Sequence, residues 1–112
     1  MKFAYLIEYV ADMDRAVSFY RDQLGLTLRF QTPEWTEFDT GATTLALHIA
    51  SGQHPAGTLE MGFNVPDIHQ FYGEATAKGV EFVSPPAAEQ FGTFARLKDS
   101  EGTIITVSRA GK

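Results

Sequence analysis

The residues of this sequence that could do chemistry fall mostly in short, apolar, strand-like runs. His48 lies in such a run, where an imidazole can act as a hydrogen-bond partner or acid–base group in a pocket, or make one structural hydrogen bond at a strand edge. Tyr5 and Tyr9 occupy alternate positions of another run, so they share one side of a strand and either line a pocket or plug it. Trp35 follows a turn, where its indole can stack on a flat ligand or pack against a rim. These side chains favour the binding of a small molecule.

Composition excludes several other classes of function. The sequence has no cysteine, which rules out disulfides, thiolate nucleophiles and Cys-ligated zinc. It also shows no Ser-His-Asp set, nucleotide-binding loop or helix-borne pair of metal-binding histidines. A net charge of −5 with nine scattered Lys and Arg argues against nucleic acid, and no apolar stretch approaches the roughly 20 residues of a membrane helix. We therefore expect a cytoplasmic protein without nucleic-acid or membrane partners.

The same order of elements is predicted twice along the chain. A buried strand at 3–10 precedes a helix that Asp12 caps and Gly25 ends. Three strands follow at 26–31, 35–39 and 43–50. After the polar link 51–57, in which we expect His54 to face solvent, come a strand at 58–65 and a helix from Asp67 to Gly79. Strands follow at about 80–83, 93–98 and 103–108, and Pro85-Pro86 and Gly92 separate the first two of them.

The two halves match position by position. Val10 and Asp12 correspond to Val65 and Asp67, at an offset of 55 residues. With 112 residues, the chain has the length of one domain. The sequence therefore predicts a single α+β domain, residues 1–112, made of two tandem βαβββ modules at about 1–50 and 58–112.

Three segments carry a resemblance to a known family. They are VADMDRAVSFYRDQLGL (10–26), FDTGATTLALHIA (38–50) and ARLKDSEGTIITV (95–107), and they resemble the vicinal oxygen chelate superfamily, the glyoxalase, bleomycin-resistance and dioxygenase group. The resemblance implies a curled mixed sheet in which each module forms a half-barrel, with the helices on the convex face and the concave faces enclosing a cup. It does not imply one activity, because this superfamily includes isomerases, lyases, ring-cleaving dioxygenases, thiol transferases and drug-binding proteins.

Alternation along the strands of such a fold assigns side chains to the two faces of each sheet. Tyr5, Tyr9, His48 and Glu60 are expected on the cup side. Glu8 is expected beneath the first helix, where an unpaired carboxylate is costly. Three alternatives follow: the Glu8 side chain reaches the edge of the sheet, it pairs with a cation such as Arg15, or the strand register is not the one assumed here.

The resemblance also locates the positions that hold metal in related enzymes. In this sequence those positions carry Tyr5, Ala46, Glu60 and Thr106, of which only Glu60 is a good ligand. Tyrosine binds metal as a phenolate, which its ordinary pKa near 10 disfavours unless the ion is as acidic as Fe(III). We predict no catalytic metal and no other cofactor. If a divalent metal (Zn, Ni, Mn or Fe) binds, Glu60 and His48 are its expected ligands.

The predicted function is the sequestration of a drug or metabolite, as in antibiotic resistance, in an aromatic-lined cup. The expected ligand contacts are Tyr5, Tyr9, Trp35, His48, Glu60 and Arg96. Arg96, if it points inward, favours a carboxylate or phosphate on the ligand; otherwise it is an ordinary surface arginine. Two alternatives stay open: a metal-dependent lyase, isomerase or dioxygenase, and a metal-free enzyme with His48 or Glu60 as general base. The resemblance further implies a homodimer.

Overall fold

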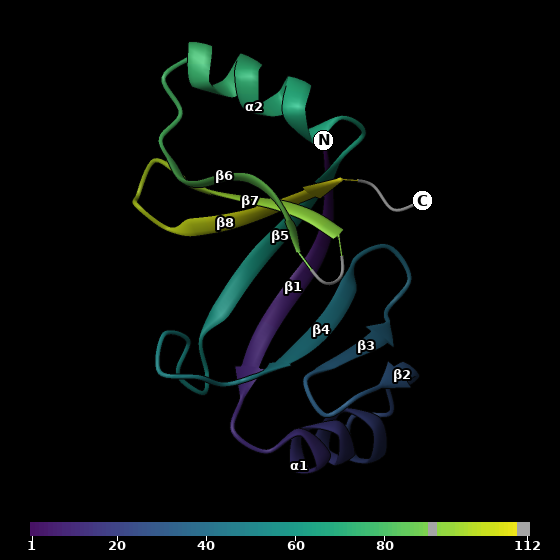
Figure 1. The fold of residues 1–112 in the computed structure, drawn as a ribbon. Coiled ribbons are helices and arrows are strands. Elements are labelled where there is room, and N and C mark those ends of the chain that lie inside the picture. The colour runs from purple at the N-terminus through teal and green to yellow at the C-terminus, as the bar shows by residue number, and fades with distance from the viewer. Residues whose placement is uncertain (90–91, 110–112) are drawn as a thin grey trace. The chain divides into compact units, whose positions relative to one another are not determined.

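The computed structural model describes residues 1–89 and 92–109 and confirms a mixed α+β fold in which the order βαβββ occurs twice (Figure 1). The first set comprises β1 (Lys2–Val10), α1 (Met13–Ser18), the π-helical turn η1 (Phe19–Gln23), β2 (Thr27–Gln31), β3 (Trp35–Asp39) and β4 (Thr44–Ile49). The second comprises β5 (Leu59–Val65), α2 (Ile68–Ala77), β6 (Phe82–Glu89), β7 (Gly92–Lys98) and β8 (Ile104–Arg109). None of the helices in these ranges is long and apolar enough to cross a membrane.

The chain divides into two compact units of equivalent topology. The first unit is Ala4–Glu60, and the second joins Met1–Phe3 to the chain from Met61 onward. The strand order is β2-β3-β4-β1 in the first unit and β5-β8-β7-β6 in the second. In both, one parallel pair (β1 with β4, β5 with β8) adjoins antiparallel neighbours. The repeat in the sequence is therefore a repeat of mixed sheets, and the link 51–57 belongs to the first unit.

Each unit buries one face of its sheet beneath its helix. In the first unit, Val10, Phe38 and Leu47 pack against Val17 of α1. In the second, the corresponding cluster is Val65, Ile68, Ala95, Leu97 and Val107. The alternation predicted from the sequence is confirmed, because Leu47 lies in the helix-side cluster while Ala46 lies in a separate cluster on the other face. The side chains at the alternate strand positions therefore lie on the other face of each sheet, away from the helix.

The first helix differs from the predicted single helix that ends at Gly25. Its α-helical part stops at Ser18, and η1 follows with a hydrogen bond from the Leu24 N–H to the Phe19 carbonyl, five residues back (3.1 Å). A π turn inserts an extra residue into the helix and rotates the residues around it. Gly25 then ends the segment at φ +78°, a left-handed conformation that favours glycine.

Strand β6 is the second difference from the expected elements. The prediction ended this strand before Pro85-Pro86, but β6 runs through both prolines to Glu89. Its pairing with β7 shifts register between Phe82 and Ser84 and again between Ser84 and Ala87. Strand β6 is the last strand in the order of its unit. Proline has no backbone N–H to donate, and a strand at such a position, with bulges in its pairing, tolerates this loss.

Glu8 finds a partner beneath α1, and it is not Arg15. The hydroxyl of Tyr20 in η1 donates to Glu8 Oε1 over 2.6 Å. Burial raises the pKa of Tyr20 to about 12, helped by this hydrogen bond and by the negative charge of Glu8. The predicted face of Glu8 is therefore right, and a neutral phenol donor takes the place of the expected cation.

This pair predicts a specific alkaline titration. Below pH 10.0 Tyr20 is neutral in both the folded and the unfolded chain; above it the unfolded chain ionises first, because the folded pKa is about 12. The free energy of unfolding should therefore fall as pH rises from 10 to about 12. In Glu8→Gln, the pKa of Tyr20 should move back toward 10.0. Tyrosinate absorbance against pH, with Tyr20→Phe to identify the Tyr20 step, measures this shift; a wild-type Tyr20 that ionises at its ordinary pKa would contradict the prediction.

Candidate ligand-binding site

The face of the first unit that lies away from α1 is lined by aromatic rings. Tyr5, Ile7 and Tyr9 of β1 pack there with Ala46 of β4 and Trp35 of β3. The strand pairing explains why, since His48 is the direct partner of Tyr9 on one side and of Trp35 on the other. The ring centroids lie 5.0 Å apart for Tyr9 and His48, 6.0 Å for His48 and Trp35, and 5.9 Å for Trp35 and Tyr5. We call Tyr5, Trp35, His48 and Tyr9 the aromatic row.

His48 is held in one orientation by its own strand. Its Nδ1 lies 2.8 Å from the carbonyl oxygen of Ile49. Because a carbonyl can only accept, Nδ1 carries the proton, and Nε2 of the neutral ring is the acceptor. The imidazole therefore makes the structural hydrogen bond considered from the sequence and also lies between two aromatic rings.

Trp35 is oriented by two charged residues beside the aromatic row, Glu37 and Arg29. Its indole Nε1 donates to Glu37 Oε2 over 2.9 Å, and Arg29 Nη1 donates to Glu37 Oε1 over 2.8 Å. Trp35 and Glu37 thus share a face, as predicted. Burial, followed by the charge of Glu37, raises the pKa of Tyr5 against an opposing effect of Arg29, so Tyr5 stays a neutral phenol at neutral pH.

A buried carboxylate lies at the other end of the row. Tyr9 donates its hydroxyl proton to Glu60 Oε1 over 2.8 Å, and the Glu60 side chain is only 6% exposed. The same oxygen lies 3.7 Å from His54 Nε2. The Tyr9 ring thus connects the aromatic row to an acidic group.

His54 was expected to face solvent, and 39% of its side chain is exposed, but the structure adds a contact that the sequence did not predict. Its ring stacks on Tyr9 with centroids 4.4 Å apart and an interplanar angle of 11°. Hydrogen bonds between Ser51 and His54 form a tight turn that presents the imidazole (Ser51 N–H to His54 O, 2.9 Å; His54 N–H to Ser51 Oγ, 3.2 Å). The Gly57 N–H then donates to the Tyr9 carbonyl over 2.8 Å and anchors the link to β1. The serine three residues before His54, together with Gly52 and Pro55, was a local signal of such a turn.

Arg96 belongs to the second unit. Its neighbours Ala95 and Leu97 are in the core of that unit, so Arg96 lies on the opposite face, where it pairs across the strands with Thr106. Its Nη1 donates to Glu89 Oε2 over 3.2 Å, and a third of its side chain is exposed. The structure therefore groups five of the six predicted contact residues in the first unit and places Arg96, already ion-paired, on the sheet of the second.

The positions that hold metal in related enzymes carry a donor set that does not fit a hard divalent cation. Ala46 offers no donor atom and is completely buried, and Thr106, also buried, offers only a hydroxyl. Tyr5 is a phenol whose raised pKa disfavours the phenolate that would bind metal. Within residues 1–89 and 92–109, no three His, Asp or Glu side chains converge as a ligand cluster. Glu60 is the one carboxylate among these positions.

Comparison with known proteins agrees with this architecture. The uncharacterized Bacillus subtilis (strain 168) protein YetH is 27% identical over 106 residues, which cover 87% of this chain and 88% of YetH. Among solved structures, an NAD-dependent benzaldehyde dehydrogenase from Legionella pneumophila superposes with a TM-score of 0.80 at 17% identity, covering 96% of this chain and 98% of that one.

A second solved structure carries a family description. A glyoxalase/bleomycin resistance protein/dioxygenase superfamily member from Vibrio splendidus 12B01 superposes with a TM-score of 0.71 at 16% identity, covering 95% and 97% of the two chains. At such identities the structural matches show the fold alone. Residues 2–107 match the sequence profile of a family with the same description. Because this match spans nearly the whole sequence, the chain belongs to the Glyoxalase/Bleomycin resistance protein/Dioxygenase superfamily.

Proposed function

We propose that this protein sequesters a flat aromatic small molecule, a drug such as an antibiotic or a metabolite, on the aromatic row of its first unit and without a catalytic metal. One observation carries the proposal: Trp35, His48 and Tyr9 form a continuous row across three adjacent strands. Aromatic rings recognise one another by offset or edge-to-face contact, each worth about 0.5–1.5 kcal/mol beyond the area buried. These three members of the aromatic row therefore favour a planar ligand.

The polar groups of the row narrow the choice of ligand. In the neutral form of His48, Nε2 is an acceptor, because Nδ1 donates to the Ile49 carbonyl. Glu37 at the outer end is a carboxylate, which offers acceptor sites beyond those used by Trp35 and Arg29. These groups favour a planar ligand that carries hydrogen-bond donors on its edge.

Trp35, the only tryptophan, provides the test. Titration with planar heteroaromatic compounds, such as aminoacridines and aminoquinolines, should quench its fluorescence saturably at one molecule per chain. In His48→Ala the affinity should fall about tenfold, as expected for the loss of one aromatic contact. His69→Ala, which removes an exposed histidine from α2, is the matched control. Quenching that never saturates, or equal affinities for the two variants, would refute sequestration on this face.

A second candidate function is a metal-dependent lyase, isomerase or dioxygenase. The approach of His54 Nε2 to 3.7 Å from Glu60 Oε1 favours it, because an imidazole and a carboxylate are the usual protein ligands of such ions. Metal content measured by mass spectrometry on protein from supplemented medium separates the two candidates. Near-stoichiometric Zn, Ni, Mn or Fe that disappears in Glu60→Gln would replace sequestration by the enzyme candidate.

Two further expectations from the sequence belong to this proposal, a homodimer and a cytoplasmic location. Light scattering on the purified protein tests the first. A homodimer requires twice the chain mass of 12.4 kDa, and a mass that stays at 12.4 kDa across the concentration range would remove it from the proposal.

A further inference from the structure

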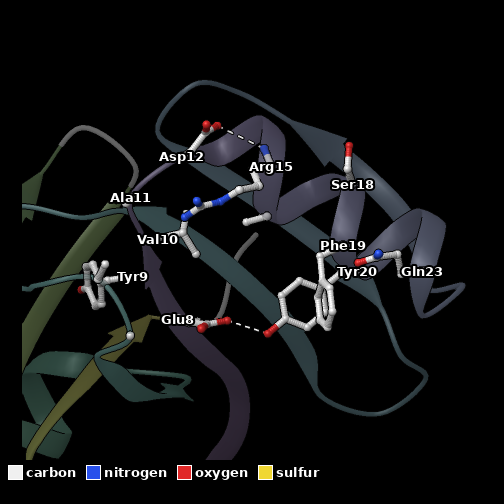
Figure 2. A pocket seen from close by; sticks show the side chains of 13 residues that line it. Glu8, Tyr9, Val10, Ala11, Asp12, Arg15, Ser18, Phe19, Tyr20 and Gln23 are labelled. Atoms are coloured by element: carbon white, nitrogen blue, oxygen red, sulfur yellow. Dashed lines mark hydrogen bonds between the residues drawn. The ribbon is translucent and has the colours of Figure 1, made fainter.

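A second candidate site lies on the α1 side of β1, the face opposite the aromatic row. A cavity of about 690 Å³ is lined by the end of β1, by α1 and η1, and by Ala56 and Gly57 of the link (Figure 2). Small-molecule sites span about 300–1,000 Å³, so this volume suffices for a small organic ligand. Of the aromatic row, only Tyr9 is also among the residues that line this cavity.

Glu8 supplies negative charge to the cavity. Its carboxylate is half-buried on β1 and accepts one hydrogen bond, from the neutral hydroxyl of Tyr20. Within the described parts of the chain, no Lys, Arg or His lies at ion-pair distance from it. Removing a carboxylate from water is costly unless it is paired. A cationic group of a ligand would supply the missing counter-charge.

Arg15 supplies positive charge to the same cavity. Its backbone N–H donates to Asp12 at the start of α1, but its guanidinium has no ion pair or hydrogen bond to any residue in 1–89 or 92–109. Figure 2 shows the side chain reaching from α1 toward Val10, while the Glu8 carboxylate accepts the hydrogen bond of the Tyr20 hydroxyl. The planar guanidinium binds carboxylates in a bidentate manner. The cavity therefore offers separate positions for an anion and a cation.

Phe19 supplies an apolar wall. The residue is 45% exposed, and its ring meets that of Tyr20 edge-to-face with centroids 5.1 Å apart. Both residues belong to η1, and both line the cavity. Single π turns within helices frequently occur at functional sites.

We propose that this cavity binds a zwitterionic small molecule of the amino-acid class. Glu8 receives the ammonium group, Arg15 the carboxylate, and Phe19 packs against an apolar or aromatic side group. The ligand needs both charges because a simple amine would be repelled by Arg15, and a simple carboxylate would be repelled by Glu8.

Three probes of nearly equal shape test the charge requirement: L-phenylalanine, 2-phenylethylamine, which lacks the carboxylate, and 3-phenylpropanoate, which lacks the amine. Calorimetric titration of the whole chain should show the tightest binding for L-phenylalanine, with each truncated probe at least about tenfold weaker, as expected for the loss of one charge-assisted contact. Equal binding of all three probes, or binding of none, would overturn the proposal.

Variants locate the binding. Glu8→Gln keeps an oxygen that accepts from Tyr20 and should weaken L-phenylalanine about tenfold; Arg15→Gln should do the same. Asp22→Asn and Arg21→Gln remove one charge each from an exposed ion pair in η1 and are the matched controls. An effect of the controls as large as that of the cavity variants would refute the site. So would tighter binding of 2-phenylethylamine to Arg15→Gln without loss of L-phenylalanine affinity, which would show that Arg15 merely neutralises Glu8.

Discussion

Phe38→Ala should lower the free energy of unfolding by about 3–5 kcal/mol, the range measured for phenylalanine truncation in protein cores. Phe38 of β3 has no exposed surface and contacts the cluster of Val10, Val17 and Leu47 beneath α1. Truncation removes the ring and leaves a cavity that the surrounding strands cannot fill by a small shift. Chemical denaturation followed by Trp35 fluorescence, three residues away on the same strand, measures the loss.

Phe30→Ala is the matched control for this prediction. Phe30 lies on the adjacent strand β2, but the residue is 43% exposed, so its truncation should cost less than about 1 kcal/mol. If Phe38→Ala does not fold, Phe38→Leu should still show a smaller loss in the same direction. Equal losses for Phe38→Ala and Phe30→Ala would mean that the helix-side cluster is not the core of the first unit.

Tyr9→Phe should lower the free energy of unfolding by about 1.5–3 kcal/mol, the usual value of a hydrogen bond to a charged group. The Tyr9 hydroxyl donates to Glu60, whose side chain is only 6% exposed. Phenylalanine keeps the ring that stacks on His54 but removes the donor. The buried carboxylate then loses a hydrogen bond that water cannot easily replace.

Tyr5→Phe provides the comparison on the same face of the sheet. Tyr5 packs beside Trp35, and the described residues offer its hydroxyl no hydrogen bond. Its loss should change the free energy of unfolding by less than about 0.5 kcal/mol. Denaturation curves that rank the two variants in the opposite order would contradict the conclusion that the Tyr9 hydroxyl stabilises Glu60.

Much of the fold follows from local patterns. Asp12 and Asp67 were predicted as helix caps at matching positions, and each accepts a hydrogen bond from the backbone N–H three residues on, in Arg15 and Gln70. Alternation likewise assigned Val10 and Leu47 to the helix side of the sheet. Caps and alternation act between residues close in sequence, which is why one sequence suffices to predict them.

The elements that differ from prediction depend on neighbours distant in sequence. Strand β6 continues through Pro85 and Pro86 because it lies at the end of its strand order, a position that the sequence does not reveal. The π turn at Phe19–Gln23 allows Tyr20 to reach Glu8, twelve residues earlier. In both cases the tertiary structure outweighed the local conformational preference on which the prediction was based.

The sequence by itself determined the two βαβββ modules and the face of each strand, because periodicity and capping are local. Only the tertiary structure decided which of those side chains meet. The order β3-β4-β1 and its register put Trp35, His48 and Tyr9 in one row, and the fold of the link put His54 on Tyr9. The physical reason is that strand order and register depend on pairings between segments far apart in the chain, whose energies no single stretch of residues contains.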